Sequence, residues 1–192
     1  MALRTVEQYK ASLRDGRVVY FRGTRVEDVT THPVIGVAVN HAAIDYEIAH
    51  QPQHRNLAVW HDPATGQEFS RYFKVPSHAD DLLQRSALIE MSTRLGGTLV
   101  VLIKEIGTDC LFALHLVARQ MDQKLGTAYL QRVQGIYEHC RNNDLAMAVA
   151  QTDVKGNRSR GPGEQEHPDY YVRVIERRPT ASLCAGQKFT RR

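Results

Sequence analysis

Apolar residues recur at helical spacing along most of the chain up to residue 140. Thr5 and Gln8 have the spacing of a capping box, which predicts a first helix that runs to Leu13. The pattern predicts a mainly α-helical fold for residues 1–150. Further helices are predicted over residues 35–49, 77–96, 111–121 and 127–140.

Several residues are predicted to set the ends of these helices. Thr30 or Thr31 is expected to cap the second helix, and Pro52 is expected to end it. The Gly-Thr-Asp sequence at residues 107–109 is predicted to form a turn and a cap before the helix at 111–121. The third helix is predicted to bury its apolar residues, which are Ala79, Leu82, Leu83, Ala87, Leu88 and Met91.

The sequence predicts fewer extended segments than helices. β-Branched and aromatic residues predict small strands near residues 18–21 and 57–75. Residues 152–168 are polar and without periodicity, which indicates a long loop, and residues 170–176 then alternate as a strand does. One strand leaves its backbone groups unpaired, so we expect its partner strands to be missing from this chain.

Composition and charge exclude several classes of protein. With 42% hydrophobic and 24% charged residues the chain is typical of a soluble globular domain, and without a long apolar run we expect a cytoplasmic protein that does not bind membranes. Three of the four net positive charges are Lys188, Arg191 and Arg192, so we predict no nucleic-acid surface. The three cysteines favour reduced thiols. His50 and His54 are spaced as a helical metal pair, but a proline between them argues against a metal site.

Four stretches together resemble the 4-hydroxyphenylacetate 3-hydroxylase family of flavoproteins, which share the acyl-CoA dehydrogenase architecture. The polar stretch Thr152-Asp153-x-Lys155-Gly156-Asn157-Arg158 is the most specific of them. The resemblance implies the N-terminal helical domain of that fold, followed by the first strand of an incomplete β-domain. The other three stretches are Glu7-Gln8-Tyr9-x-x-Ser12-Leu13, Val26-Glu27-Asp28-Val29-Thr30-Thr31-His32-Pro33 and Asn143-Asp144-Leu145.

The resemblance also implies a cofactor. In this architecture the polar loop contacts the flavin ring, which needs hydrogen-bond donors and a cation at its pyrimidine edge. Members of the family use reduced FAD, delivered by a separate flavin reductase, to hydroxylate a phenolic ring. Composition alone leaves a solvated polar loop as the alternative. The residues expected to bind FAD are Gln151, Thr152, Asp153, Lys155, Gly156, Asn157 and Arg158.

The chain departs from both chemical patterns known in the family. Its aromatic hydroxylases carry an Arg, a Tyr and a His where this chain has Ile106, Cys110 and Val149, none of which binds a phenolate. Its CoA-ester dehydratases carry two iron–sulfur cysteines where Val101 and Glu105 stand, so we expect no cluster. The substrate is therefore left open between a small aromatic compound and an acyl compound such as a CoA ester.

Polar residues in the otherwise apolar stretch before residue 111 are candidates for the substrate pocket. Lys104, Glu105 and Asp109 either line a pocket beside the flavin or pair with one another as buried ions. Cys110 and Val149 complete the predicted pocket, because they occupy positions that bind substrate in the hydroxylases.

The last residues are expected to be out of frame. Residues 180–192 replace a turn and strand of the family, and shifting a coding sequence for that segment by one base reproduces this tail, so we expect a frameshift near residue 179. The chain then divides into a helical domain (1–150), the flavin loop with the start of the β-domain (151–179) and the tail. We expect such a fragment to be inactive alone, or to be a non-catalytic helical remnant, and expect homo-oligomers only of full-length relatives.

Overall fold

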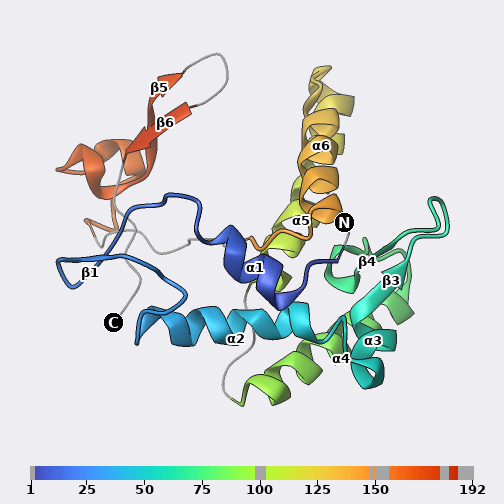
Figure 1. Ribbon diagram of the computed structural model, residues 1–192. Coiled ribbons are helices and arrows are strands. Elements are labelled where there is room, and N and C mark those ends of the chain that lie inside the picture. Colours follow the sequence, from blue (N-terminus) through green and yellow to red (C-terminus); the bar gives the residue numbers. More distant parts are fainter. Residues whose placement is uncertain (1–2, 98–102, 148, 150–155, 178–181, 186–192) are drawn as a thin grey trace. The chain divides into compact units, whose positions relative to one another are not determined.

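The computed structural model describes residues 3–97, 103–147, 149, 156–177 and 182–185. The chain divides into two units, residues 1–148 and residues 149–192, and each is described by itself. The described part of the first unit is built from six α-helices (Figure 1). They are α1 (Val6–Ser12), α2 (Ile35–Glu47), α3 (Pro52–Ala58), α4 (Ala79–Gly96), α5 (Glu105–Leu125) and α6 (Tyr129–Asn142).

The predicted mainly helical fold is confirmed, and so are several helix ends. Thr5 and Gln8 form the predicted capping box, in which each side chain accepts a hydrogen bond from the other residue's backbone N–H, at 3.2 and 3.0 Å. α4 ends at Gly97, whose φ of +67° is the left-handed conformation that favours glycine. Within the described residues, no helix combines the length and the apolar character needed to cross a bilayer.

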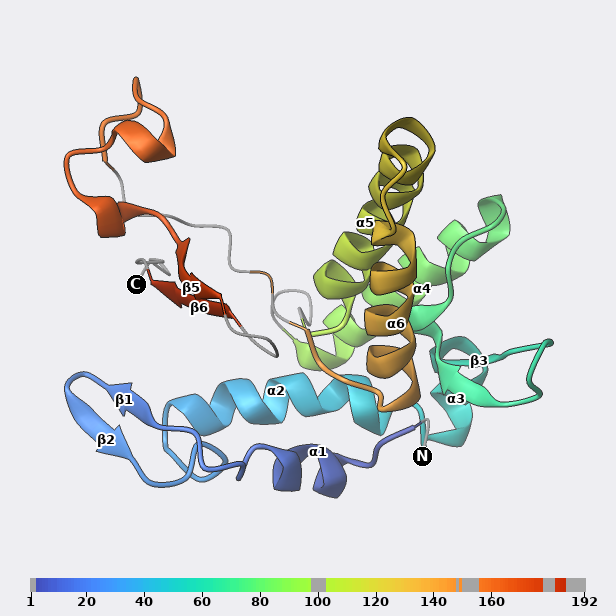
Figure 2. The ribbon, with the colours of Figure 1, turned by 90° about the horizontal axis from the view of Figure 1, so that it is seen from above.

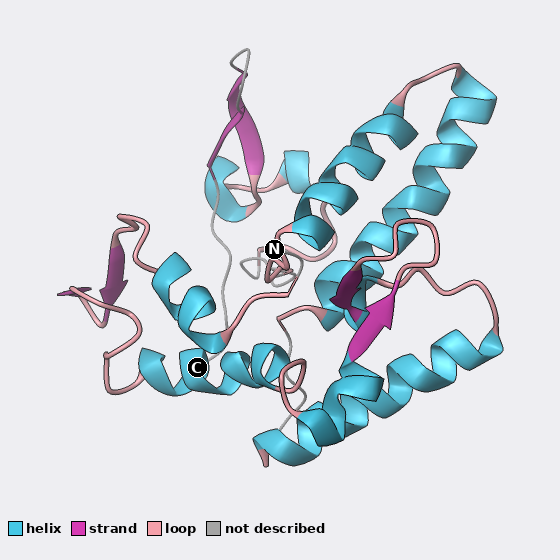
Figure 3. Ribbon diagram, turned by 45° about the vertical axis from the view of Figure 1, so that its right-hand side comes forward, coloured by secondary structure: helices cyan, strands magenta, loops and turns pink. Residues whose placement is uncertain are grey.

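Two small antiparallel hairpins lie where the sequence predicts extended structure (Figure 3). The first follows α1 directly, and the second lies between α3 and α4. A 3-10 helix, η1 (Arg71–Phe73), leads from the second hairpin toward α4. The strands are β1 (Val19–Phe21), β2 (Thr24–Val26), β3 (Val59–His61) and β4 (Glu68–Ser70).

The core of the first unit lies around α2. α1 lies along α2 (Figure 2), and the rings of Tyr9 and Tyr46 stack between them with centroids 4.5 Å apart. α5 and α6 pack against each other as a helical hairpin, and Phe73, Leu111 and Cys140 form a buried cluster at its base. Tyr46 and Phe73 are fully buried, so their contacts position the α1–α2 pair and the α5–α6 hairpin.

The buried face of α4 is not the apolar face that the sequence predicts. Leu82 and Leu83 are 57% and 67% exposed. Three of the buried residues are polar, and each has hydrogen-bonding partners, so their burial leaves few polar groups unsatisfied. The buried residues of α4 are Asp81, Arg85, Leu88 and Ser92.

The start of α2 also differs from the prediction. Neither Thr30 nor Thr31 caps the helix, because the carboxylate of Asp28 accepts hydrogen bonds from the N–H and the hydroxyl of Thr30, at 2.8 and 2.7 Å. The Nδ1 atom of His32 accepts from the backbone N–H groups two and three residues later, at 3.2 and 3.1 Å. Pro52 does not end α2 but opens α3, a position that tolerates proline.

The predicted turn at residues 107–109 is wrong, because these residues lie inside α5, which begins at Glu105. Gly107 serves close packing instead of a turn. A Cβ atom at this position would lie 2.3 Å from the Cβ of Met147 and 2.9 Å from its carbonyl oxygen. The glycine therefore lets the chain that follows α6 cross α5 at short range.

Replacing Gly107 with alanine is expected to destabilise the helical unit by about 1–3 kcal/mol, because the added methyl group displaces Met147. The matched control is Gly135→Ala in α6, where a Cβ would meet no atom within 4 Å and helix propensity predicts a gain of up to about 1 kcal/mol. Urea denaturation measures both changes. Two shifts of the same sign would contradict the packing role of Gly107.

The second unit contains a β-hairpin. β5 (Arg173–Arg177) confirms the predicted strand, although residues 168–170 form the 3-10 helix η3 (Pro168–Tyr170) instead of its beginning. The expectation that all partner strands are missing is wrong, because β6 (Ser182–Ala185) pairs with β5 in antiparallel fashion. Backbone pairing needs no particular side chains, so the pattern of the tail did not reveal β6. All side chains of β5 are exposed, and a further 3-10 helix, η2 (Pro162–Glu164), precedes this hairpin.

Candidate functional site

The residues predicted to bind a flavin fall into two groups. Gly156, Asn157 and Arg158 belong to the described part of the second unit. These three residues are therefore the part of the predicted flavin loop whose geometry the structure describes. The others, Gln151, Thr152, Asp153 and Lys155, lie outside the described residues.

The side chain of Gln165 organises this loop. Its Oε1 atom accepts a hydrogen bond from the N–H of Asn157 at 2.9 Å, and its Nε2 atom donates to the carbonyl oxygens of Asn157 and Arg160, at 2.9 and 3.0 Å. Asn157 in turn accepts from the N–H and the hydroxyl of Ser159, at 3.0 and 2.6 Å. Asn157 is thus engaged within its own loop. Sequence reasoning missed Gln165, because a side-chain contact across eight residues in a segment without periodicity produces no recognisable sequence pattern.

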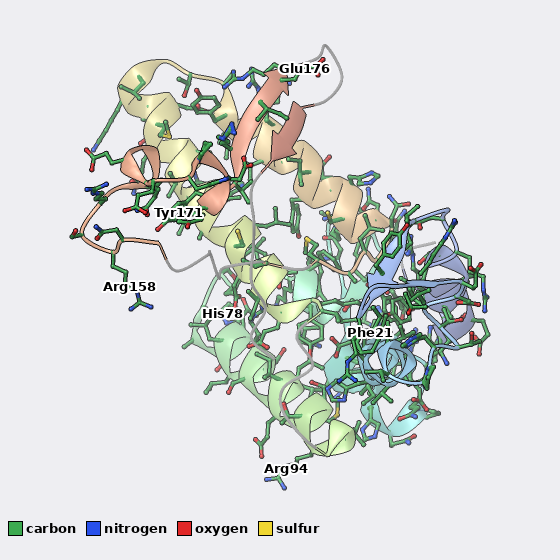
Figure 4. The ribbon with its side chains drawn as sticks, turned by 90° about the vertical axis from the view of Figure 1, so that its left-hand side faces the viewer. Phe21, His78, Arg94, Arg158, Tyr171 and Glu176 are labelled. Carbon is green, nitrogen blue, oxygen red and sulfur yellow. The ribbon has the colours of Figure 1, made fainter. Side chains whose placement is uncertain are left out.

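Gly156 lies close to other atoms, and the nearest of them belongs to a side chain of the loop itself. A Cβ at Gly156 would lie 2.1 Å from the Oε1 of Gln165. The side chain of Arg158 is exposed and extends away from the ribbon (Figure 4). The described part of the loop is therefore folded by its own contacts and presents the guanidinium groups of Arg158 and Arg160 to solvent.

Lys104, a predicted pocket residue, is buried in the first unit with an exposed fraction of 0%. Its Nζ atom lies 2.7 Å from Oδ1 of Asp144 and 3.9 Å from the centroid of the Tyr46 ring. Nζ also donates to the backbone oxygen of Asp45 at 3.4 Å. Lys104 is thus held in an ion pair with a residue outside the predicted set.

Glu105 and Asp109 do not pair with Lys104, so the prediction that the three residues pair with one another is wrong. Asp109 is half exposed and pairs with Arg85 at 2.7 Å. Glu105 is partly buried, and its Oε2 atom has no hydrogen-bond partner among the described residues. Burial raises the pKa of Glu105, and the charge of Arg85 opposes that rise.

Arg85 joins α4, η1 and α5, and sequence reasoning missed it because it is one of many charged residues in α4. Its guanidinium donates to the carbonyl oxygens of Tyr72 and Glu105, at 3.0 and 2.9 Å, and to the hydroxyl of Thr108 at 2.8 Å. It also lies over the rings of Tyr72 and Phe112, at 5.7 and 5.6 Å. Arg85 therefore fixes the first turns of α5.

A cavity of about 760 Å³ lies between α4, α5 and α6. Asp109 lines it, together with Arg85, whereas Lys104, Glu105 and Cys110 do not. Its wall combines aliphatic and aromatic side chains with a few charged groups, as small-molecule sites do. The remaining lining residues are Val75, Pro76, Leu82, Leu111, Phe112, His115, Leu116, Arg119, Gln134, Tyr137 and Glu138.

A second face of α5 carries Ile106 and Cys110, which stand where the family resemblance predicts substrate-binding residues. Ile106 and Cys110 are exposed, and Leu114 and Val117 continue the same face at helical spacing with exposed fractions of 46% and 51%. Val149 belongs to the second unit and is 40% exposed. The face of α5 from Ile106 to Val117 is thus apolar except for one thiol.

No three histidine, cysteine, aspartate or glutamate side chains gather in a metal-binding arrangement within the described ranges. His50 contacts the carbonyl oxygen of Arg4 through Nε2 at 3.0 Å. His54 lies in α3, which begins at Pro52. The histidine pair considered from the sequence therefore spans the start of a helix.

Comparison with known proteins identifies the family of this chain. A family model for the N-terminal region of 4-hydroxyphenylacetate 3-hydroxylase matches residues 5–189. A 4-hydroxybutyryl-CoA dehydratase/vinylacetyl-CoA-Δ-isomerase from Clostridium aminobutyricum is 31% identical over 188 residues, which cover 97% of this chain and 38% of that protein. The oxygenase component of 4-hydroxyphenylacetate 3-monooxygenase from Klebsiella oxytoca is 42% identical over 90 residues, or 46% of this chain and 17% of that one.

A solved structure shows the same fold. The oxygenase component of a 4-hydroxyphenylacetate 3-monooxygenase, in complex with FAD and 4-hydroxyphenylacetate, superposes with a TM-score of 0.79 at 24% identity, over 95% of this chain and 37% of that one. The chain thus spans less than two fifths of the relatives that it matches. Because the family model covers nearly the whole chain, the protein belongs to the 4-hydroxyphenylacetate 3-hydroxylase family and has the mainly helical N-terminal fold of its acyl-CoA dehydrogenase-like members.

Proposed function

We propose that this chain supplies the N-terminal helical wall and the flavin loop of an FAD-dependent oxidoreductase that hydroxylates an aromatic ring with reduced flavin. The observation that carries the proposal is the match of the family model, which runs without a break through the helical unit and the loop at residues 151–158. The solved relative in complex with FAD supports the choice of cofactor.

The residues of the described loop fit a flavin. Gln165 fixes the backbone at Gly156 and Asn157, so a binding surface here loses little conformational freedom on binding. The exposed Arg158 guanidinium can hold negative charge at the pyrimidine edge. Bound FAD would supply the redox chemistry, which no side chain of this chain can supply. The chain's own contribution is to bind and orient the ring.

The helical unit offers an apolar surface of its own. The exposed face of α5, with Ile106, Cys110 and Leu114, is apolar enough to exclude water from a bound ring. Lys104 is engaged with Asp144, so we do not assign it to substrate. Ile106 and Cys110 cannot form an ion pair with a phenolate, which favours an uncharged aromatic group over a phenolate as substrate.

A CoA-ester-handling flavoprotein is the second candidate. It is favoured by the likeness to the 4-hydroxybutyryl-CoA dehydratase, which is 31% identical over 97% of this chain, whereas the FAD-bound monooxygenase structure is 24% identical over 95%. Glu105 stands where we align one of the dehydratases' cluster cysteines, and a carboxylate is not the usual ligand of an iron–sulfur cluster. A change in the flavin spectrum on addition of 4-hydroxybutyryl-CoA, but not of 4-hydroxyphenylacetate, would support this candidate.

The proposal includes one protein partner. The name of the Klebsiella relative, an oxygenase component, implies a separate reductase, and we extend that arrangement to this chain. The third candidate is a non-catalytic helical remnant, which would bind neither flavin nor a reductase. Flavin affinity therefore separates the first two candidates from the third.

Titration of the purified chain with FAD is expected to show saturable binding with a Kd of about 10 µM, equivalent to about −7 kcal/mol. Replacing Arg158 with glutamine is expected to weaken this binding by about tenfold, because it removes one charge-assisted hydrogen bond. Quenching of flavin fluorescence measures both.

Arg160→Gln is the matched control, because Arg160 is exposed in the same loop but lies outside the family's polar stretch. Equal weakening by both substitutions would indicate attraction by net charge alone. Absence of saturable binding would overturn the proposal that this chain holds flavin and would support the remnant.

A further inference from the structure

Asp45 in α2 is the least satisfied charged group in the helical unit. Its exposed fraction is 1%, and neither carboxylate oxygen has a hydrogen-bond partner among the described residues. A carboxylate without hydrogen bonds or a counter-charge is among the most costly groups to bury. The surroundings of Asp45 therefore decide whether it is charged.

Among the described residues, the cation near Asp45 is Lys104, which is already neutralised. The Nζ of Lys104 forms its short contact with Asp144, at 2.7 Å, and reaches only the backbone oxygen of Asp45, at 3.4 Å. Asp144 is fixed from the other side, because its Oδ2 accepts from the N–H of Arg4 at 3.1 Å. With both aspartates ionised, the buried cluster would hold two negative charges against one positive charge.

The other ionisable groups that face Asp45 in the described part of the chain do not offer a second cation. Glu105 at the start of α5 and Asp144 after α6 add negative charge, and Tyr72 of η1 is an uncharged hydroxyl that bonds to Ser92 at 3.1 Å. Burial raises the pKa of Asp45 to about 7, although the charge of Lys104 opposes the rise. Geometry and electrostatics thus agree that the folded unit favours the protonated carboxyl group.

We propose that Asp45 is a buried proton switch: the folded unit keeps it as an uncharged carboxylic acid in mildly acidic solution, and its ionisation at higher pH weakens the attachment of α2 to η1, α4 and the start of α5. These are the elements that meet around Asp45. Tyr72 of η1 and Leu88 of α4 pack in one cluster with Ile48, which directly follows α2, so a charge at Asp45 acts on the main core.

The sign of the effect follows from proton binding. The unfolded chain releases the Asp45 proton near the ordinary pKa of 3.8, and the folded protein retains it up to about pH 7. Between these values the folded protein binds more protons, so raising the pH favours unfolding. Asp28 does not interfere above pH 5, because hydrogen bonds from Thr30 and Arg14 lower its pKa to about 2.

Urea unfolding of the full chain at pH 5 and pH 8 tests the proposal. The unfolding equilibrium constant is expected to rise by about a hundredfold between the two pH values. Asp45→Asn keeps the shape without the charge, so this rise should shrink to less than about tenfold, and the variant should be more stable than the wild type at pH 8. Glu105→Gln is the control, because Glu105 is partly buried and burial raises its pKa as well.

A pH dependence that Asp45→Asn leaves intact, or that Glu105→Gln abolishes, would overturn the proposal. A second measurement does not require the variant to fold. The ¹³C chemical shift of the Asp45 carboxyl carbon in the wild-type chain should titrate with a midpoint near pH 7, and a midpoint below pH 5 would contradict the switch.

Discussion

Replacing Asp144 with asparagine is expected to lower the free energy of unfolding of the helical unit by about 3–5 kcal/mol. The side chains of Lys104 and Asp144 are 0% and 1% exposed, and their charged atoms lie 2.7 Å apart. Asparagine keeps the shape of the acceptor but removes its charge, so the ammonium group is left unpaired in a medium of low dielectric constant. Urea denaturation at pH 5 measures the loss.

Two further measurements show whether the charge is the cause. The double variant Lys104→Met with Asp144→Asn removes both charges and should recover most of the lost stability. In Asp144→Asn alone, ionised Asp45 can replace the missing counter-charge, so the loss should be smaller at pH 8 than at pH 5. A loss below about 1 kcal/mol at both pH values would show that the pair does not stabilise the fold.

The helices could be predicted from the sequence wherever local signals and tertiary packing agree. The capping box at Thr5 is found as predicted, and α4 ends at Gly96, the predicted end of the helix over residues 77–96. Gly107 shows the limit of such reasoning, because a sequence does not distinguish a glycine needed for close packing from a glycine needed for a turn. The distinction lies in Met147, about forty residues away, and no local pattern contains it.

The candidate site was less accessible from the sequence for the same reason. Lys104 was singled out correctly as a polar residue in a buried stretch, but its partner Asp144 lies beyond two helices. Arg85 was missed because helical periodicity assigns charged residues to the exposed face, whereas its carbonyl, hydroxyl and ring contacts make burial favourable. Periodicity reports average polarity, and buried polar residues depend on specific partners.

Replacing Arg85 with methionine is expected to cost about 2–4 kcal/mol of stability. The substitution leaves the carbonyl oxygen of Tyr72 and the hydroxyl of Thr108 without the guanidinium donor, and each buried group that loses its partner costs about 1 kcal/mol or more. The carbonyl oxygen of Glu105 loses one donor but still accepts from the hydroxyl of Thr108 at 2.9 Å. Asp109 contributes little, because its side chain is 55% exposed. Arg85→Lys should recover only a small part, since an ammonium group cannot reproduce the planar guanidinium between two rings.

Arg94 in the same helix provides the matched control for Arg85. It pairs with Glu90 at 2.7 Å, but the two side chains are 78% and 63% exposed, and Arg94 extends outward near the end of α4 (Figure 4). Arg94→Met should therefore change stability by no more than about 0.5 kcal/mol. If both substitutions have equally small effects, the other buried residues of α4, which are Asp81, Leu88 and Ser92, hold the helix in place. If the Arg85 variant is much less stable, α4 is held by a polar face, and the start of α5 depends on a single guanidinium group for its position.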